Sequence, residues 1–427
     1  MVLEMSMESL FAVVDIFWVS KLGSDAVALV GVTETVLSLV YAVAMGLSAG
    51  ATAIVSRRIG EKDPDGAARS GFQVILLAIA LAATIGVLGV VLAPSLLVAM
   101  GAASALSAHG ATFTRVMLGG NVIIMLLFVI NAIFRGAGDA AIAMRSLWLA
   151  NILNIVLGPC FIFGVGPVPA LGVTGAAVAT TVGRGVGVIY QLVVLASARG
   201  VIRIDRRHAR LEPAVMAAVG KISASAGFQT LVETASWLGL VRILASFGSA
   251  ALAGYTIAIR VLVFALLPAW GMANAAATLV GQNLGARAPD RAERSVKLAA
   301  AYNVAFLGVA SAVFVAFPEG IIRSFTDDPA VVPFAVECLR IVALGFFFFA
   351  FGGVVVQAFN GAGDTTTPLL VNIVCFWLVK IPAAYVLARG FGLGPRGVFI
   401  AIAGAYSVQS AVAAVLFRRG KWKTKVV

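Results

Sequence analysis

Phe134-Arg-Gly-Ala-Gly-Asp139 recurs 225 residues later as Phe359-Asn-Gly-Ala-Gly-Asp364. The same offset relates further pairs along the chain: Gly60 and Gly285, Pro64 and Pro289, Gly23-Ser24 and Gly248-Ser249, and Gly172-Val173 and Gly397-Val398. One offset that holds from near the start of the chain to near its end indicates an internal duplication. The sequence therefore predicts two similar halves.

The composition indicates that these halves lie in a lipid bilayer and not in water. Hydrophobic residues make up 61% of the 427 residues and charged residues only 12%, whereas a soluble domain carries about 25% charged residues. A helix that spans a bilayer needs about 20 mainly apolar residues. That window gives roughly twelve spanning helices, near residues 1–20, 26–55, 70–98, 113–134, 141–164, 171–197, 214–244, 250–281, 293–316, 333–358, 367–388 and 396–417.

A repeat of six helices returns the chain to the same side of the membrane, so the two halves run in parallel. We therefore predict an all-α membrane protein with two parallel six-helix bundles. The expected lobes are residues 1–197 and 214–427, and the arginine-rich segment 198–213 is the expected cytoplasmic linker.

The net charge of +12 is concentrated in short clusters between apolar stretches, which is typical of loops at an anionic membrane surface and not of a nucleic-acid interface. Most basic residues follow the even-numbered helices or lie in the C-terminal tail. The opposite loops hold Lys21, Arg242, Arg323, Arg389 and Arg396. Because basic loops stay inside, we expect a multi-pass plasma-membrane protein with both termini in the cytoplasm. No cleavable signal peptide is expected, since Glu4 and Glu8 interrupt the first apolar stretch.

Charges within spanning helices are costly and are candidates for function. Glu4, Glu8 and Asp15 share one face of the first helix, and helices two, seven and eight carry Glu34, Glu233 and Arg260. Glu8 and Glu233 are separated by the 225-residue offset. The functional hypothesis is that these carboxylates line a cavity that binds cations or protons. The alternative is that they form internal ion pairs, for example Glu34 or Glu233 with Arg260.

Amides and glycines form a second group. Asn131, Asn151 and Asn154 can orient a carboxylate or coordinate a cation, or they can join helices by hydrogen bonds. The repeated Gly-Ala-Gly-Asp is interpreted as a tight turn in which Asp139 and Asp364 cap the next helix. Gly183, Gly185 and Gly187 are expected to allow close helix approach.

Several of these features resemble the multidrug and toxin extrusion (MATE) family over nearly the whole chain. They are Val14-Asp15 followed by Gly23-Ser24, the Val280-Gly281-Gln282-Asn283-Leu284-Gly285 stretch, and the doubled Gly-Ala-Gly-Asp. The resemblance implies a V-shaped fold of twelve helices and export of cationic or amphipathic compounds in exchange for Na⁺ or H⁺. It also implies that Asp15, Asn154 and Asn131 match the coupling residues of the N-terminal lobe, and that Glu233 matches the helix 7 glutamate of the NorM-type branch.

This chain departs from the family pattern at three points. Gly158 replaces the helix 5 aspartate of archaeal and DinF-like members, and Phe349 stands where the NorM type has a helix 10 aspartate. Helix 1 also begins later than is usual in the family. The pattern favours neither Na⁺ nor H⁺.

The sequence thus predicts a secondary antiporter that uses a coupling-ion site at Asp15, Asn131 and Asn154 and a substrate or cation cavity with Glu8, Glu34, Glu233 and Arg260. It is expected to act as a monomer on small molecules, without a cofactor, a bound metal or a catalytic residue. An alternative within the same superfamily is a flippase for lipid-linked saccharides, favoured by the cationic residues Arg115, Arg184, Arg260, Arg340 and Lys380. A channel suits the repeat less well than alternating access does.

Overall fold

The structure is a computed structural model that describes residues 2–100, 104–165, 169–197 and 200–425. The side chains of residues 2, 6, 8, 9, 12, 13, 24 and 104–109 are outside this description. Every regular element within the described residues is helical, as predicted.

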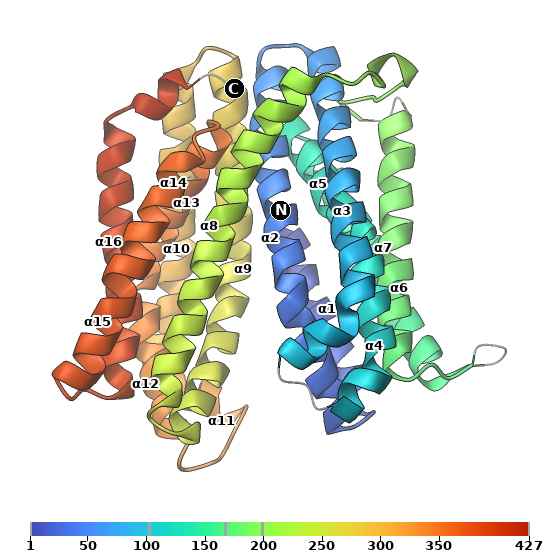
Figure 1. Cartoon of the computed structure of the whole chain (residues 1–427). Coiled ribbons are helices and arrows are strands. Elements are labelled where there is room, and N and C mark those ends of the chain that lie inside the picture. Colours follow the sequence, from blue (N-terminus) through green and yellow to red (C-terminus); the bar gives the residue numbers. More distant parts are fainter. Residues whose placement is uncertain (1, 101–103, 166–168, 198–199, 426–427) are drawn as a thin grey trace. The chain divides into compact units, whose positions relative to one another are not determined.

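The first half contains α1 (Val2–Ser20), α2 (Ser24–Gly60), α3 (Pro64–Ala99), α4 (Ser104–Gly119), α5 (Asn121–Ala137), α6 (Ala140–Phe163), α7 (Val173–Ala196) and the 3₁₀ turn η1 (Arg206–His208) (Figure 1). The second half begins with α8 (Pro213–Ala245), α9 (Ser249–Gly285), α10 (Pro289–Ala316), α11 (Pro318–Arg323), α12 (Val332–Leu344) and α13 (Phe346–Gly361). It ends with α14 (Thr366–Asn372), η2 (Ile373–Lys380), α15 (Ile381–Tyr385), η3 (Val386–Gly390), α16 (Pro395–Arg418) and η4 (Lys421–Thr424).

Ten helical runs among the described residues are long and apolar enough to cross a bilayer, and the bent pair of α12 and α13 makes eleven. The remaining run is α1, in which Glu4, Glu8 and Asp15 add polarity to 19 residues. The twelve predicted helices therefore match the helical runs, with α4–α5, α12–α13 and α14–η3 each counted as one. The α12–α13 bend of 52° lies at Gly345.

Two compact units divide the chain between Gly227 and Phe228, inside α8. The start of α8 belongs to the first unit because it packs closely on α2. A Cβ atom on Gly46 would lie 2.5 Å from the carbonyl oxygen of Ser223, and one on Gly50 would lie within contact distance of the Ser223 side chain. The two glycines thus allow the two helix backbones to approach each other.

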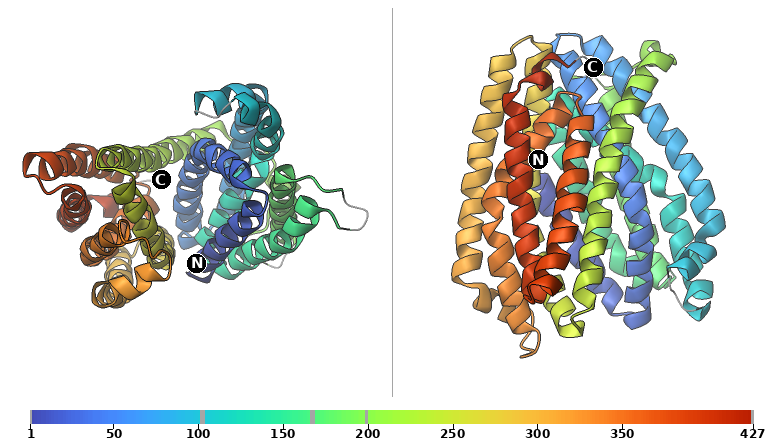
Figure 2. Two further views of the ribbon diagram at one scale, coloured as in Figure 1. Left: turned by 90° about the horizontal axis from the view of Figure 1, so that it is seen from below. Right: turned by 60° about the vertical axis from the view of Figure 1, so that its left-hand side comes forward.

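Each unit packs its helices as a bundle, which the end-on view of Figure 2 shows. In the first unit α2 contacts α3 and α5, and α6 contacts α7; in the second, α9 contacts α10 and α13, and α15 contacts α16. The main core of the second unit is apolar and includes Leu262, Leu339, Phe346, Phe399 and Ile402.

Backbone conformation repeats with the predicted offset. Gly23 and Gly248 precede α2 and α9 with the same φ of 103°. Lys62 and Arg287 both adopt positive φ, at 60° and 55°, in the turns before α3 and α10. Non-glycine residues rarely adopt this conformation, so its recurrence is evidence of duplication independent of residue identity.

The offset changes to 222 at the last helix of each half. Gly172 and Gly394 are the equivalent N-caps, with φ 57° and ψ of −137° and −142°. Gly175 and Gly397 are likewise equivalent, since a Cβ on either would collide with the preceding helix backbone. The predicted match of Gly172 with Gly397 is therefore wrong in three dimensions, because the loop before α16 is shorter.

The Gly-Ala-Gly-Asp segments form the expected turns, with positive φ at Gly138 and Gly363. Their predicted capping role is wrong: neither aspartate side chain caps the following helix. Asp139 accepts a hydrogen bond from the backbone N–H of Val201 at 2.8 Å, and Asp364 lies 3.3 Å from Nζ of Lys425. Each aspartate holds the polar segment that follows its own half.

Candidate functional site

Asp15 and Glu34 line one small cavity of about 20 Å³ in the first unit. The walls come from α1, α2, α4 and α7, and the lining residues are Asp15, Val30, Thr33, Glu34, Leu37, Phe113, Met117, Ala176, Ala177 and Thr180. A water molecule needs roughly 10–15 Å³ of such space. The cavity therefore accommodates one water-sized species, and an organic compound does not fit.

The polar lining consists of four oxygen-bearing side chains. Asp15 is half-buried and Glu34 is exposed, whereas Thr33 and Thr180 are buried. The hydroxyl of Thr33 is 2.8 Å from that of Thr114 on α4, which fixes its position. Carboxylate and hydroxyl oxygens suit hard cations such as Na⁺, and the carboxylates also accept protons.

Close packing of α7 on α6 connects Asn154 to this cavity. A Cβ on Gly183 would lie 2.7 Å from the carbonyl oxygen of Ala150, and one on Gly187 would lie 3.1 Å from that of Ser146. The prediction that these two glycines allow close helix approach is confirmed. With the helices this close, Nδ2 of Asn154 donates to Oγ1 of Thr180 at 2.8 Å.

Arg184 supplies a positive charge near the two carboxylates. Its guanidinium interacts electrostatically with both Asp15 and Glu34, donates to the Tyr41 hydroxyl at 3.0 Å, and lies 5.3 Å from the Phe11 ring centroid. Two carboxylates and one guanidinium give the group a formal charge of −1. One monovalent cation or one proton neutralises it.

Asn131 belongs to a separate buried network. Its Oδ1 accepts hydrogen bonds from Oγ of Ser146 at 3.0 Å and from Nε2 of Gln191 at 2.7 Å. These contacts join α5, α6 and α7. Asn131 is not among the residues that line the Asp15 cavity.

The second unit holds its own buried charge. Lys380 is only 1% exposed, interacts electrostatically with Glu233, and places Nζ 4.2 Å from the ring centroid of Phe376 and 4.9 Å from that of Trp237. Such cation–π contacts partly replace the hydration that a buried ammonium loses. Glu233 therefore has a cationic neighbour inside its own unit.

The remaining candidates are placed differently. Arg260 is exposed, and the described ion pairs of the second unit include none between it and Glu233. The side chain of Glu8 lies outside the described residues. Glu4 forms a buried ion pair with Arg135, at 2.7 Å between Oε1 and Nη1, which corresponds to the alternative interpretation of the charges on helix 1.

Sequence reasoning missed the hydroxyl residues Thr33 and Thr180 and the pairing of Glu233 with Lys380. Thr33 immediately precedes Glu34, but threonine is common in spanning helices and its hydroxyl usually bonds within the helix. Thr180 could have been found only by knowing that α7 lies against α6 beside Asn154.

Together these features define a multi-pass membrane transporter with duplicated halves and a small cavity with two carboxylates in the first half. A family model for MatE matches residues 1–160 and 226–386, so its two matches begin 225 residues apart, as do the repeated motifs. The chain belongs to the MATE family, whose members are transporters, and the predicted family membership is confirmed.

Individual relatives agree with this assignment. The chain is 27% identical over 426 residues to a probable multidrug resistance protein NorM of Thermotoga maritima, covering 99% of this chain and 90% of the relative. An outward-facing multidrug resistance MATE transporter superposes with a TM-score of 0.93 and 27% identity over 100% of this chain and 95% of that one. A MOP superfamily transporter from Pyrococcus furiosus is described as having a binding pocket of reverse polarity. It superposes with a TM-score of 0.92 and 26% identity, over 99% of this chain and 94% of that one.

Proposed function

We propose that this protein is a secondary antiporter that exports cationic or amphipathic organic compounds in exchange for Na⁺ or H⁺. The observation that carries the proposal is the cavity of about 20 Å³ shared by Asp15 and Glu34. Its size suits the coupling ion and not the organic cargo. Family membership and the multidrug resistance relatives support the direction of transport and the class of cargo.

The charge balance of the site gives a mechanism for coupling. Two neighbouring carboxylates repel each other, and the repulsion falls when they share a proton or bind a cation. Occupancy of the cavity then favours the arrangement in which α1, α2 and α7 lie close around it. Coupling requires only that the ion prefer one conformation and the cargo the other.

The orientation proposed from the basic loops places both termini in the cytoplasm. An inward-negative potential then assists entry of the coupling cation, at about 2.3 kcal/mol per charge for each 100 mV. The transporter is proposed to act as a monomer and to need no cofactor beyond this ion.

Efflux of a fluorescent organic cation from proteoliposomes tests the proposal, with Na⁺ and pH gradients imposed separately. Wild-type protein should respond to at least one gradient, and Asp15→Asn should abolish that response. Asp25→Asn is the matched control, because Asp25 is an exposed residue in the first turn of α2 and does not line the cavity. Wild-type gradient dependence in Asp15→Asn would overturn the coupling mechanism.

One observation favours a second candidate cargo. Lys380 is a buried cation among aromatic rings in the second unit, and such a group suits an anionic compound, including the pyrophosphate of a lipid-linked saccharide. The pocket of the Pyrococcus furiosus relative is described as having reverse polarity. Uptake of an anionic dye that depends on Lys380, without transport of cationic dyes, would favour this alternative.

A further inference from the structure

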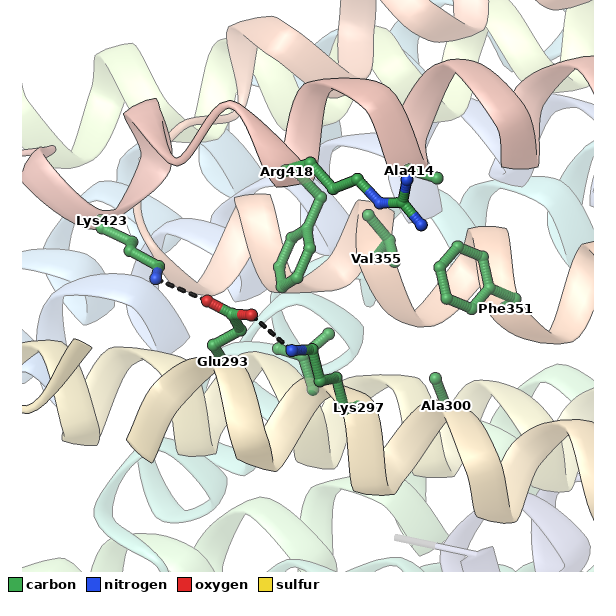
Figure 3. A pocket seen from close by; sticks show the side chains of 10 residues that line it. Glu293, Lys297, Ala300, Phe351, Val355, Ala414, Arg418 and Lys423 are labelled. Atoms are coloured by element: carbon green, nitrogen blue, oxygen red, sulfur yellow. Dashed lines mark hydrogen bonds and ion pairs between the residues drawn. The ribbon is translucent and has the colours of Figure 1, made fainter. Parts of the chain in front are cut away.

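A second, larger cavity of about 330 Å³ lies within the second unit, between α10, α13, α16 and η4. Figure 3 shows its lining side chains. They are Glu293, Val296, Lys297, Ala300, Phe351, Val355, Ala414, Phe417, Arg418 and Lys423. No part of the proposed transport cycle uses this cavity.

The lining separates into a charged end and an apolar end. Lys423, Glu293 and Lys297 lie at one end, whereas Phe351, Val355 and Ala414 lie at the other. The side chain of Arg418 extends back along α16, so its guanidinium reaches toward the apolar end (Figure 3). A ligand that fills the cavity must therefore combine a charged group with an apolar body.

Glu293 sets the direction of the two lysines. Its Oε1 is 2.6 Å from Nζ of Lys297, and its Oε2 is 2.5 Å from Nζ of Lys423. The hydrogen bond from Lys423 to Glu293 raises the pKa of Lys423 above its usual value, so this ammonium stays charged at neutral pH. Each ammonium has three N–H donors, and the bond to Glu293 uses one of them. The lining residues, with three basic groups and one carboxylate, carry a formal charge of +2. Outside the lining, Oδ1 of Asp290 lies 3.7 Å from Nζ of Lys423.

Two anchors in the C-terminal segment hold Lys423 over the cavity. The Trp422 ring stacks on Phe417 with centroids 4.8 Å apart, and its Nε1–H donates to the carbonyl oxygen of Phe417 at 3.0 Å. Further along, Nζ of Lys425 contacts Asp364 of the second Gly-Ala-Gly-Asp turn. Lys423 is therefore held in place by packing, whereas the exposed Lys297 is positioned by its ion pair with Glu293.

Exposed apolar side chains adjoin the cavity. Leu298, next to Lys297, is 54% exposed, and Val415, next to Ala414, is also 54% exposed. Exposed apolar side chains beside basic residues at helix ends are typical of the boundary between acyl chains and headgroups. In the proposed orientation this boundary lies at the cytoplasmic face, where anionic lipids attract basic segments.

The first unit has no matching set of charges at this position among its described residues. With the 225-residue offset, Glu293 and Lys297 correspond to Ala68 and Phe72. There the linker covers α3 instead: Gln73 donates to the carbonyl oxygen of Arg210 at 2.6 Å. The cavity is thus a feature of the second half and not a by-product of the duplicated fold.

We propose that this cavity binds the headgroup of an anionic phospholipid from the cytoplasmic leaflet. The phosphate accepts hydrogen bonds from Lys297 and Lys423 at the charged end, and the start of an acyl chain lies against Phe351 and Val355. The Arg418 guanidinium, which reaches toward the apolar end, donates to an ester carbonyl oxygen of the lipid's glycerol backbone. A free inorganic anion lacks the apolar part that the second end of the cavity is built to contact, so the lipid is the occupant that complements both ends.

Native mass spectrometry of the full detergent-purified chain tests this proposal by titration with phosphatidylglycerol. Phosphatidylcholine with the same acyl chains and inorganic phosphate are the comparison ligands. Arg418→Gln should weaken phosphatidylglycerol binding about fivefold, which corresponds to about 1 kcal/mol for one basic residue. Lys297→Gln combined with Arg418→Gln should weaken it about 25-fold. Arg419→Gln should have no effect, because Arg419 is exposed, like Arg418, but does not line the cavity.

Equal binding of phosphatidylglycerol and phosphatidylcholine would overturn the proposal, as would equal losses in Arg418→Gln and Arg419→Gln. Competition by inorganic phosphate at similar concentrations would show a simple anion site and would also overturn it. These readouts do not involve transport, so they remain informative if the coupling mechanism fails.

Discussion

Replacing Gly46 by alanine should destabilise the first unit, because this glycine lies where α2 meets the start of α8. The added Cβ would lie 2.5 Å from the carbonyl oxygen of Ser223 and 2.7 Å from the backbone nitrogen of Gly227. Both are backbone atoms, so no side-chain rotation relieves the overlap and α8 itself must move. Overpacking of this kind costs about 1–3 kcal/mol.

Gly31→Ala is the matched control on the same helix. No described atom beyond the helix itself lies within 4 Å of a Cβ at Gly31, so this change should add about 0.5–1 kcal/mol of helix stability. For a unit of 150–250 residues, 1 kcal/mol shifts the unfolding midpoint by roughly 2–4 °C. Gly46→Ala has the same gain in helix propensity, so overpacking alone should place its unfolding midpoint in detergent roughly 2–12 °C below that of Gly31→Ala. Equal midpoints would show that α2 and α8 do not approach as described.

Two further predictions concern buried charges. Glu4→Gln should cost about 3–5 kcal/mol of stability, because it leaves the largely buried Arg135 without its carboxylate; Glu61→Gln, which removes an exposed ion pair with Arg58, should change the midpoint little. Lys380→Met should be more harmful alone than in combination with Glu233→Gln, with a coupling free energy of about 1 kcal/mol in a double-mutant cycle. Strictly additive effects would mean that the two charges do not interact.

The helical architecture could be predicted well from the sequence, because the architecture depends on apolar stretches and on a duplication that both recur along the chain. Apolar stretches of spanning length are set by bilayer thickness, and the duplication is visible in residue identities. Gly23 and Gly248 were identified as a repeated pair, whereas their positive φ was not predicted. The break between α4 and α5 at Gly120 and the π-helical turns of η2 and η3 were not predicted, because they depend on packing against neighbouring helices.

The candidate site was predicted less completely. Asp15 and Glu34 were identified because charge within a spanning helix is rare and costly, and the structure places both in one cavity. Thr33 and Thr180 carry no such signal, since the cost of burying a hydroxyl is met by a local hydrogen bond. The anchoring roles of Asp139 and Asp364 were also missed, because their partners Val201 and Lys425 are distant in sequence.

Cation binding to the purified protein, in the absence of cargo, tests whether the cavity of the first unit holds the coupling ion. Calorimetric titration with Na⁺, together with measurement of proton release, should detect one monovalent cation or proton per chain in the wild type. Asp15→Asn should lose this binding, and Thr180→Val should weaken it about tenfold through loss of one hydroxyl ligand. Thr181→Val should bind normally, because the Thr181 hydroxyl donates to the carbonyl oxygen of Ala177 and does not line the cavity. Wild-type affinity for both Na⁺ and H⁺ in Asp15→Asn would place the coupling ion elsewhere in the protein.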